Sequence, residues 1–562
     1  MFKVAIIGGM AAGCKAAARL SRLCSEYDIT IIERGSYISF GNCGLPLYAG
    51  GELDDFYALS KTAYGVVRDE NYFKSVKGIT VLTNTEVEEI NPLRCEVNCR
   101  NLTDNNRFSL HVNGLIFATG SVPVEPHFPI PDSPRVSHFH APDDAKRFKE
   151  EARKGGVKKA VIIGGGFIGC ELTESLSALW GIETLLIEKE QYILQNLLDY
   201  EFSKIVENRI KQNGVGIATG CDVQKVIIDD NGLPVVVLDN GEEIKCDYVF
   251  YNLGAKPNTS LAVKTGVKLG PHGGILVDER MRTNVPNIWA AGDCVEIKNI
   301  VTGKTQCCAM GSLSNRMARE AADSINGKNI SFKGTVGSVS LKLFDLIVCR
   351  TGLTEDKAKK IGFDAESVLG CWSDRPEYHP EAKNLFAKIV YEKPGLKLLG
   401  LQLAGEGEVT RYIDTFAHLL ANYETAYQLI NLEHAYTPAH SSPVSPLNYL
   451  GYIILNQEKE GLEDIKPEEA GDFDGNVLDV REEFEVTEQS KFKKVRNIPL
   501  SKLRSSMDEI EPDKPVMCFC TKGPRSYEAA RYLKNHGFNS AKYLSGGLHF
   551  YNELFNGVEL NK

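Results

Sequence analysis

Two cysteines stand in sequence settings where a thiol could do chemistry, Cys43 and Cys520. Cys43 lies in the stretch SFGNCGLP (residues 39–46), between two glycines and before a Leu-Pro pair where a helix can begin. Unpaired N–H groups and the positive dipole end at a helix N-terminus favour the thiolate, which is the reactive form. We therefore expect Cys43 to be a catalytic thiol, although most free cysteines are buried and inert.

The bulk composition limits the function classes. A chain of 562 residues is too long for one hydrophobic core, so several domains are expected. A net charge of -10 argues against a nucleic-acid-binding surface. The apolar start of the chain is too short for a signal peptide, and no apolar run could span a bilayer. The 15 cysteines are scattered, without metal-site spacing. We expect a cytoplasmic protein without a metal site.

The first element that could position Cys43 is a nucleotide-binding unit. The apolar run 3–7 is followed by GGMAAG (8–13), a helical stretch, and a second apolar run that ends at Glu33. This order is that of a βαβ dinucleotide unit, in which Gly8 permits the tight turn, Gly13 allows close packing and Glu33 accepts from a ribose hydroxyl. Met10 replaces the middle glycine of the usual fingerprint. Downstream, Thr119-Gly120 ends another apolar run, where the backbone can pass close to a cofactor.

A second unit has an intact fingerprint. The apolar run 160–163 leads into GGGFIG (164–169), with Gly164, Gly166 and Gly169 at the fingerprint positions, and the next apolar run ends at Glu188. Glu188 would bind a free 2′-hydroxyl and repel a 2′-phosphate, which favours NADH over NADPH, although Lys189 weakens this preference. A third run ends in Gly292-Asp293, where Asp293 can accept from hydroxyl groups of a flavin nucleotide.

These elements, in this order, resemble the flavoprotein disulfide reductases with two dinucleotide-binding domains. The resemblance implies FAD on the first unit, with Asn42 among its contacts, and NADH or NADPH on the second. It also implies a discontinuous FAD-binding domain (1–150 and 250–325) interrupted by an NAD(P)H-binding domain (151–249).

Cys43 has no second cysteine five residues further on, where Tyr48 stands. The chain therefore resembles the single-cysteine branch of that family, which contains coenzyme A disulfide reductases, NADH oxidases and peroxidases, and persulfide or polysulfide reductases. In that branch the face of the first helix near the cysteine can receive coenzyme A phosphates. The matching positions are Arg19 and Arg22, with Ser39 as a further substrate contact, although a solvated helix face explains the arginines nearly as well.

Residues 326–455 resemble the family's α/β dimerisation domain, which implies a homodimer. In coenzyme A disulfide reductases this domain supplies tyrosines to the partner subunit's active site. The matching positions are Tyr436 and Tyr378, but His379 replaces a second tyrosine that the family often has, so loop packing is an alternative. Cys307-Cys308 has no assigned role.

The charged stretch 456–470 reads as a linker, and residues 471–562 resemble a rhodanese domain. Cys520 occupies the nucleophile position in the loop CTKGPRS (520–526). Such a loop turns N–H groups toward the sulfur, lowers the thiol pKa and holds a persulfide, and Arg525 adds positive charge.

The combined hypothesis is an α/β enzyme with two Rossmann-like domains, a dimerisation domain and a rhodanese domain. It would reduce coenzyme A disulfide, persulfide or polysulfide at Cys43, while Cys520 carries sulfane sulfur and coenzyme A serves as a mobile arm. One alternative is an NADH oxidase or peroxidase with a sulfenic acid at Cys43. The other is a redox-sensing scaffold whose rhodanese domain only binds partners.

Overall fold

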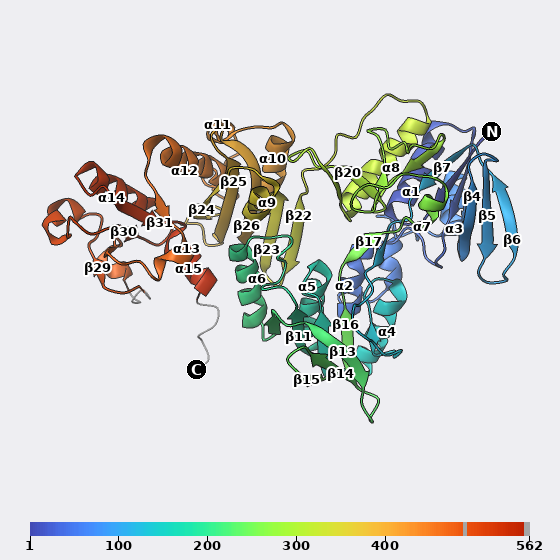
Figure 1. The fold of residues 1–562 in the computed structure, drawn as a ribbon, viewed down its shortest axis with the longest axis horizontal. Coiled ribbons are helices and arrows are strands. Elements are labelled where there is room, and N and C mark those ends of the chain that lie inside the picture. Colours follow the sequence, from blue (N-terminus) through green and yellow to red (C-terminus); the bar gives the residue numbers. More distant parts are fainter. Residues whose placement is uncertain (487–491, 556–562) are drawn as a thin grey trace. The chain divides into compact units, whose positions relative to one another are not determined.

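The structure is a computed structural model that describes residues 1–486 and 492–555. The chain divides into two compact units, Met1–Glu190 with Val215–Thr335 and Gln191–Gly214 with Val336–Lys562, and Figure 1 labels their elements. Residues 556–562, which the sequence assigns to the C-terminal domain, lie outside the described residues. Within the described ranges no helix combines the length and the apolar character needed to cross a membrane.

The first unit contains a parallel five-stranded sheet in which a glycine turn joins the first strand to a helix. Its strand order is β19 (Ile288–Ala290), β7 (Gly114–Phe117), β1 (Phe2–Ile7), β2 (Tyr27–Ile32) and β3 (Thr80–Leu82). The helices α1 (Ala11–Leu23) and α8 (Gly311–Ile325) pack against each other. Since β19 pairs with β7 from far along the chain, the sheet is built from two separated stretches.

A second five-stranded parallel sheet repeats this design. Its order is β12 (Gly216–Thr219), β11 (Glu183–Glu188), β10 (Lys159–Ile163), β16 (Tyr248–Tyr251) and β9 (Val136–Ser137). The helix α5 (Phe167–Glu174) follows β10 after the glycine turn. Every residue of 160–163 is buried, because the strands of a parallel sheet are covered on both faces.

Smaller elements complete the first unit. The helices are α2 (Leu45–Gly50), α3 (Glu70–Lys77), α4 (Pro142–Arg153) and α7 (Ser260–Lys264). The remaining strands form small sheets: β4 (Thr85–Asn91), β5 (Glu96–Asn101) and β6 (Arg107–His111); β13 (Val223–Ile228), β14 (Pro234–Leu238) and β15 (Glu243–Lys245); β8 (Ser121–Pro123) and β17 (Ala255–Pro257); and β18 (Ile275–Leu276), β20 (Val295–Lys298) and β21 (Thr305–Cys307).

The second unit contains an antiparallel five-stranded sheet. Its order is β22 (Val339–Leu343), β23 (Leu346–Gly352), β26 (Lys397–Gly405), β25 (Asn384–Glu392) and β24 (Ala365–Ser373). Its helices are α6 (Tyr200–Gln212), α9 (Glu355–Ile361), α10 (Thr410–Ala421), α11 (Ala426–Ile430) and α12 (Pro446–Glu460).

A buried ion cluster ties the segment around α6 to this sheet. Lys388 of β25 is 4% exposed, and its Nζ lies 2.7 Å from Glu201, 3.0 Å from Glu355 and 3.5 Å from Asp199. Burial alone would lower the pKa of Lys388, but the three carboxyl groups raise it above its ordinary value. Lys388 therefore stays charged. Its ion pairs hold α6 against the sheet, because moving α6 away would leave buried carboxylates without a counter-charge, which is costly.

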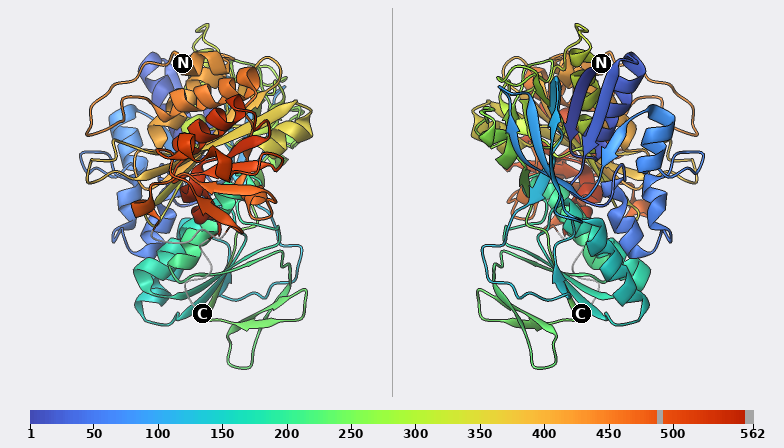
Figure 2. Two further views of the ribbon diagram at one scale, coloured as in Figure 1. Left: turned by 90° about the vertical axis from the view of Figure 1, so that its left-hand side faces the viewer. Right: turned by 90° about the vertical axis from the view of Figure 1, so that its right-hand side faces the viewer.

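The C-terminal sheet is parallel, with the order β27 (Asp464–Ile465), β31 (Ala541–Leu544), β30 (Val516–Phe519), β28 (Asn476–Asp479) and β29 (Val495–Asn497). The helices α13 (Pro467–Ala470), α14 (Pro524–Asn535) and α15 (Gly547–Phe555) accompany it. Figure 2 (left) shows this part of the chain facing the viewer, in orange and red.

The linker expected over 456–470 is a structured segment instead. It contains the end of α12, then β27, which pairs with β31, and then α13. Leu462, Ile465 and Ala470 are buried. These apolar residues are spaced among charged ones, so the composition of the segment concealed its buried face.

An aromatic contact joins α15 to the antiparallel sheet and to α6. The ring of Phe550 lies edge-on to Phe386 of β25, at 5.5 Å, and to Phe202 of α6, at 6.3 Å. The Nδ2 of Asn208 donates to the carbonyl oxygens of Glu553 and Leu554, at 2.7 and 3.0 Å, which satisfies carbonyls at the end of α15. The C-terminal sheet is thus packed onto the antiparallel sheet rather than tethered to it.

Candidate functional site

Tight glycine turns join β1 to α1 and β10 to α5. Gly8 has a φ of +112°, and a Cβ there would lie 2.1 Å from the carbonyl oxygen of Ala118. A Cβ on Gly13 would lie 1.8 Å from the carbonyl oxygen of Gly8. Both positions therefore require glycine. Since Ala118 directly precedes Thr119 and Gly120, that predicted turn lies beside the first fingerprint.

The second fingerprint repeats these contacts and leaves a space. A Cβ on Gly164 would lie 2.4 Å from the carbonyl oxygen of Asn252, and one on Gly169 would lie 2.0 Å from that of Gly164. At Gly166, by contrast, a Cβ would meet no atom within 4 Å. This open space at the start of α5 fits the pyrophosphate of a dinucleotide, which approaches the backbone there.

A carboxylate closes each turn. Glu33 accepts from the main-chain N–H of Gly9 at 2.6 Å, and Glu188 accepts from the equivalent N–H of Gly165 at 2.7 Å. Both carboxyl groups stand at the carboxyl end of the second strand of their sheet, where a ribose hydroxyl is bound in such folds. The two units therefore share one design.

The third predicted turn, at Gly292-Asp293, lies against the start of α1, beside the first turn. A Cβ on Gly292 would lie 2.9 Å from the Cβ of Ala12 in α1. Asp293 accepts a hydrogen bond from the hydroxyl of Ser314 at 2.8 Å, and burial raises the pKa of Asp293. The turns at Gly8, Thr119 and Gly292 thus meet at the start of α1, and their residues fit a dinucleotide such as FAD.

Cys43 lies in a short 3-10 turn, Asn42–Gly44, that runs directly into α2. The hydroxyl of Ser175 donates to the carbonyl oxygen of Pro46 at 3.1 Å, and the indole of Trp180 donates to that of Ala49 at 2.7 Å. These bonds hold α2 against the helical segment Ser175–Leu179, which continues α5, and against Trp180 at its end.

The expected stabilisation of the Cys43 thiolate by a helix N-terminus is wrong for this chain. The helix α2 has 6 residues, too short for a substantial dipole. Burial of the thiol, followed by the charges of Glu171 and Asp293, raises the pKa of Cys43. The protein groups around Cys43 therefore favour the thiol.

Glu171, to which the sequence analysis assigns no role, is a further candidate site residue. It lies on α5 close enough to Cys43 for the two groups to interact electrostatically. Burial and the neighbouring Glu174 raise the pKa of Glu171 to about 7. A group with such a pKa can take up and return a proton near neutral pH. Its position two residues after Gly169 was the available sequence signal.

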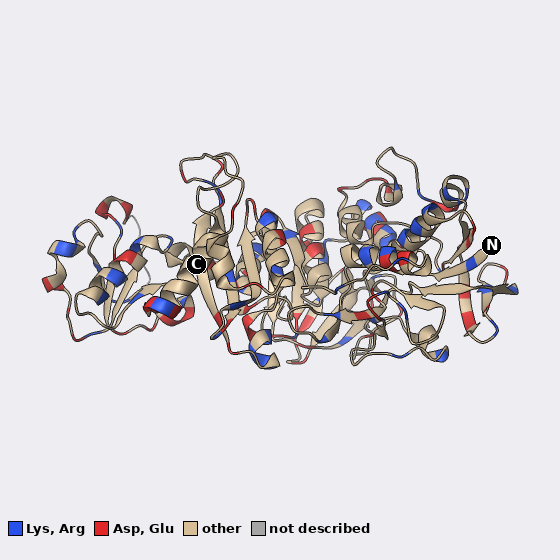
Figure 3. Cartoon of the chain, turned by 90° about the horizontal axis from the view of Figure 1, so that it is seen from above, with Lys and Arg blue, Asp and Glu red and all other residues tan. Residues whose placement is uncertain are grey.

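The predicted substrate contacts lie in different surroundings. Positive and negative residues are interspersed over both units (Figure 3). Arg19 already has an ion-pair partner, because its guanidinium lies 2.7 Å from the carboxylate of the buried Asp323 of α8. Arg22 is exposed, and Ser39 is buried with a φ of +54° and donates its N–H to the carbonyl oxygen of Gly9 at 2.8 Å. Arg19 thus has a structural partner, unlike the free group expected for a phosphate.

Cys520 lies at the end of β30, in the loop before α14, and is 1% exposed. The main-chain N–H of Gly523 donates to its Sγ at 3.2 Å, and the hydroxyl of Ser526 lies 3.5 Å away. The Gly523 N–H therefore donates to the sulfur, while the Ser526 hydroxyl accepts from the thiol and donates to the carbonyl oxygen of Gly523 at 2.7 Å. Arg525 is paired with Glu485, at 2.5 Å, a partner that the sequence did not indicate.

Tyr378 and Tyr436 are both exposed, at 76% and 49%. Desolvation and the neighbouring hydroxyl of Tyr378 raise the pKa of Tyr436. The structure thus brings these two predicted residues together.

Cys307 is a different case, because burial and Glu296 raise its pKa to about 11, so it remains a thiol. In the part of the chain that is described, no group of three or more His, Cys, Asp or Glu residues could hold a metal ion.

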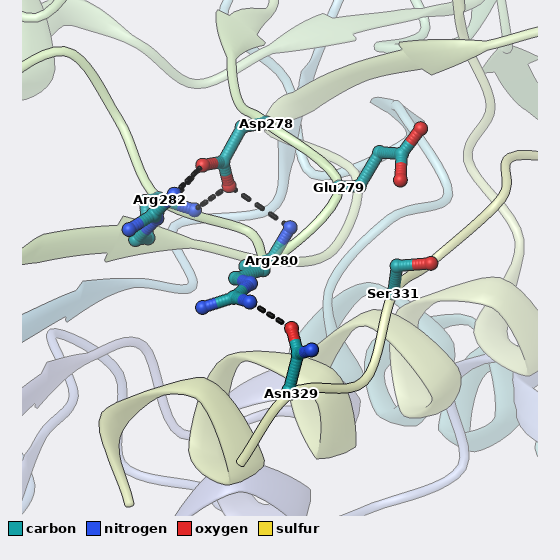
Figure 4. A pocket seen from close by; sticks show the side chains of 6 residues that line it. All are labelled: Asp278, Glu279, Arg280, Arg282, Asn329 and Ser331. Atoms are coloured by element: carbon teal, nitrogen blue, oxygen red, sulfur yellow. Dashed lines mark hydrogen bonds and ion pairs between the residues drawn. The ribbon is translucent and has the colours of Figure 1, made fainter. Parts of the chain in front are cut away.

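A surface hollow of 460 Å³ in the first unit lies apart from these residues (Figure 4). Its arginines are already bound: Arg282 donates to Asp278 at 2.7 Å, and Arg280 donates to Asn329. Glu279 and Ser331 complete the lining. The hollow contains none of the predicted site residues, so we assign no chemistry to it.

Comparison with protein families assigns most of the chain. Residues 2–311 match the family described as pyridine nucleotide-disulphide oxidoreductase, residues 339–445 match its dimerisation domain, and residues 462–553 match the rhodanese-like domain.

Individual proteins are similar over most of their length. A CoA-dependent NAD(P)H sulfur oxidoreductase from Pyrococcus abyssi is 32% identical over 454 residues, covering 80% of this chain and 98% of that protein. An NADH oxidase from Enterococcus faecalis is 30% identical over 460 residues, covering 81% and 99%. The structure of an NAD-dependent persulfide reductase from A. fulgidus has a TM-score of 0.93 at 36% identity, covering 98% of this chain and 100% of that one.

Proposed function

The chain belongs to the pyridine nucleotide-disulphide oxidoreductase family, and on that premise we propose that it cleaves sulfur–sulfur bonds at Cys43 with electrons from NAD(P)H. The substrate would be a coenzyme A disulfide, a persulfide or a polysulfide. The observation that carries the proposal is the presence of two cysteine loops in one chain: Cys43 follows the first dinucleotide unit without a resolving partner, and Cys520 lies in a persulfide-type loop.

The residues fit two dinucleotides. Gly8, Gly13, Glu33 and Asp293 would hold FAD, with contributions from Asn42, Thr119, Gly120 and Gly292. Gly164, Gly166, Gly169 and Glu188 would hold NAD(P)H. When bound, the flavin supplies to sulfur the electron pair that it accepts from the nicotinamide. Glu188 favours a free 2′-hydroxyl and hence NADH.

Cys43 would act as the nucleophile. Its thiolate attacks one sulfur of the substrate, so that the substrate's S–S bond breaks, a thiolate leaves and a mixed disulfide or persulfide forms on Cys43. Two electrons then restore the Cys43 thiolate and release the second thiol or sulfide. Glu171 can take the thiol proton and return it to the leaving sulfur, because its pKa is raised to about 7.

Cys520 would carry sulfane sulfur as a persulfide, held by the Gly523 N–H and balanced by Arg525. A diffusible or tethered thiol would then move the sulfur from Cys520. Coenzyme A is our candidate for that arm, and the CoA-dependent relative from Pyrococcus abyssi supports it.

The test compares Cys43→Ser and Cys520→Ser with the wild-type holoenzyme on coenzyme A disulfide, a coenzyme A persulfide, polysulfide and oxygen. We expect Cys43→Ser to abolish NADH-dependent turnover of the sulfur substrates and Cys520→Ser to abolish sulfur uptake from thiosulfate. Unchanged disulfide and polysulfide turnover in Cys43→Ser would contradict the proposal.

Oxygen turnover tests the main alternative. The similarity to the NADH oxidase from Enterococcus faecalis favours a sulfenic acid at Cys43 as the second candidate. A clear preference of the wild type for oxygen or peroxide over a persulfide would select it. Negligible sulfur transfer by Cys520 would instead select a scaffold role for the C-terminal domain.

Finer features belong to the same proposal. We propose a cytoplasmic homodimer in which Tyr378 and Tyr436 reach the partner subunit's active site, supported by the dimerisation-domain match and by the proximity of the two tyrosines. Arg22 and Ser39 would contact coenzyme A. Arg19 would do so only by leaving Asp323.

A further inference from the structure

The loop that carries Tyr378 emerges from the last residue pair of a strand ladder. Ser373 ends β24, Asn384 begins β25, and the two residues are paired across the ladder. The connecting segment 374–383 contains Tyr378. Both residues at the base of this loop are bound by residues of the C-terminal domain.

The first tie comes from the Cys520 loop itself. The Nζ of Lys522, two residues after Cys520, donates to the hydroxyl of Ser373 and to the carboxylate of Glu377, each at 2.7 Å. The Ser373 hydroxyl in turn donates to the same carboxylate oxygen at 3.2 Å. The three groups form a closed triangle, and Glu377 directly precedes Tyr378.

The second tie comes from α15. His549 donates its main-chain N–H to the carbonyl oxygen of Thr521 at 3.0 Å, while its ring Nδ1 lies 3.2 Å from the Nδ2 of Asn384. Burial, followed by the charge of Lys522, lowers the pKa of His549. The ring is therefore neutral near pH 7 and can accept the amide hydrogen of Asn384.

The hydrogen-bond partners of Lys522 lie outside its own loop. A lysine in a loop that holds an anionic persulfide could point at the sulfur, but among the described residues its hydrogen bonds run to Ser373 and Glu377. Its side chain is 14% exposed, so the loss of both partners would leave a largely buried charge unpaired. The hydrogen bond from Lys522 lowers the pKa of Glu377, which keeps the carboxylate charged.

We propose that Lys522 is a positioning residue that ties the Cys520 loop to the Tyr378 segment, so that the sulfur-carrying loop sets the position of Tyr378. The inference rests on the proposed function for its catalytic meaning, but the tie itself does not. When Cys520 is loaded with sulfur, its loop gains an atom and a displaced charge, and the triangle of Lys522, Ser373 and Glu377 transmits the change to the segment 374–383.

The first experiment measures the tie without activity. Hydrogen–deuterium exchange of residues 374–383 is followed in the full-length holoenzyme for the wild type, Lys522→Ala and Lys522→Arg. The control is Lys514→Ala, which removes an exposed ion pair with Glu511 on the same domain. We expect about threefold faster exchange in Lys522→Ala, corresponding to a loss of about 0.7 kcal/mol, with recovery in Lys522→Arg and no change in the control. Equal exchange in Lys522→Ala and Lys514→Ala would overturn the proposal.

The second experiment measures the coupling. Thiosulfate loads Cys520 by a balanced exchange, in which the Cys520 thiolate bonds to the outer sulfur, the S–S bond of thiosulfate breaks and sulfite leaves with the electron pair. Loading should change exchange in 374–383 in the wild type but not in Lys522→Ala. No change in the loaded wild type, with loading confirmed by mass, would contradict transmission.

The third experiment connects the tie to the reductase. Lys522→Ala should lower kcat/KM for coenzyme A disulfide by about tenfold, mainly through KM, while Lys514→Ala retains it. In a Tyr378→Phe background Lys522→Ala should have no further effect, because both changes act through one residue. If the wild type reduces none of the sulfur substrates, the proposed function fails and the exchange experiments still decide the tie. Additive effects of the two substitutions would refute positioning through Tyr378.

Discussion

The carboxyl group of Glu171 lies close enough to Cys43 to raise the pKa of its thiol, although the two residues come from the helices that follow different sequence motifs. This pairing makes the reactivity of Cys43 depend on the protonation of Glu171. The two groups repel each other only when both are deprotonated, so a proton on either Glu171 or the thiol removes the repulsion. The pair can thus exchange one proton during turnover.

Glu171→Gln should make Cys43 more reactive. Removal of the negative charge lowers the thiol pKa, and each half unit of pKa increases the thiolate fraction about threefold below the pKa. The measurement is the rate of iodoacetamide alkylation at Cys43, followed by mass spectrometry between pH 6 and 9 in the holoenzyme. Glu243→Gln, an exposed position on β15, is the control. An unchanged alkylation profile would disprove the coupling.

The same residue predicts a pH dependence of stability. The pKa of Glu171 is raised from 4.5 to about 7 in the folded chain. Its contribution to the free energy of unfolding is therefore fully present below 4.5, the pKa in the unfolded chain, and is lost as the pH rises through about 7. The shift corresponds to about 3 kcal/mol. The free energy of unfolding, measured with urea, should therefore fall less between pH 5 and pH 8.5 in Glu171→Gln than in the wild type. Equal decreases in the two proteins would argue against the raised pKa.

Lys388→Met should destabilise the second unit strongly. The substitution removes the cation between Glu201, Glu355 and Asp199 and leaves buried carboxylates unpaired, at a cost of about 3–5 kcal/mol. Urea unfolding measures the loss. Lys383→Met, which removes a more exposed pair with Glu406, should cost less than about 1 kcal/mol. Comparable losses in both variants would show that the cluster is not stabilising.

Two neighbouring glycines should respond differently to alanine. Gly166→Ala fills a space in which the protein has no atom within 4 Å, so the thermal midpoint should be retained while the KM for NADH rises about tenfold. Gly169→Ala meets a carbonyl oxygen at 2.0 Å and should lower the thermal midpoint. If Gly166→Ala leaves the KM for NADH unchanged, the pyrophosphate does not lie over this residue.

Glu485→Gln should increase sulfur uptake by Cys520 from anionic donors. Glu485 is bound to Arg525 at 2.5 Å, and the hydrogen bond from Arg525 lowers the pKa of Glu485 to about 2. Removal of this charge frees the guanidinium for the donor, and we expect the KM for thiosulfate to fall by about threefold to tenfold. Glu483→Gln, whose partner is the exposed Lys502, is the control. An increase in KM would mean that Glu485 orients Arg525 instead.

The glycine turns and their acidic partners could be predicted from the sequence because each depends on local order along the chain. Strand, turn and helix are consecutive there, so the positions of Gly8, Gly164 and Glu188 follow directly. The family and the domain types could be recognised for the same reason, and the comparisons confirm them. Apart from the linker at 456–470, the expected domain bounds stay predictions.

The environment of each reactive group could not be predicted in this way. The pKa of Cys43 depends on Glu171, which is remote in sequence, and Arg19 is bound by Asp323 from the other end of the first unit. The segment 456–470 was assigned by its charges, whereas its few apolar residues determine its structure. Long-range packing decided each of these cases, and a single sequence does not display it.

The contact of Phe550 with Phe386 and Phe202 bears on how such a chain could be assembled or divided. A cut within 456–470 would uncover the apolar faces of β25 and α6, which normally avoid water, and the truncated protein would tend to aggregate. The last domain is therefore not an interchangeable module. A recombination event that adds or removes it must be accompanied by changes on the surface that receives α15.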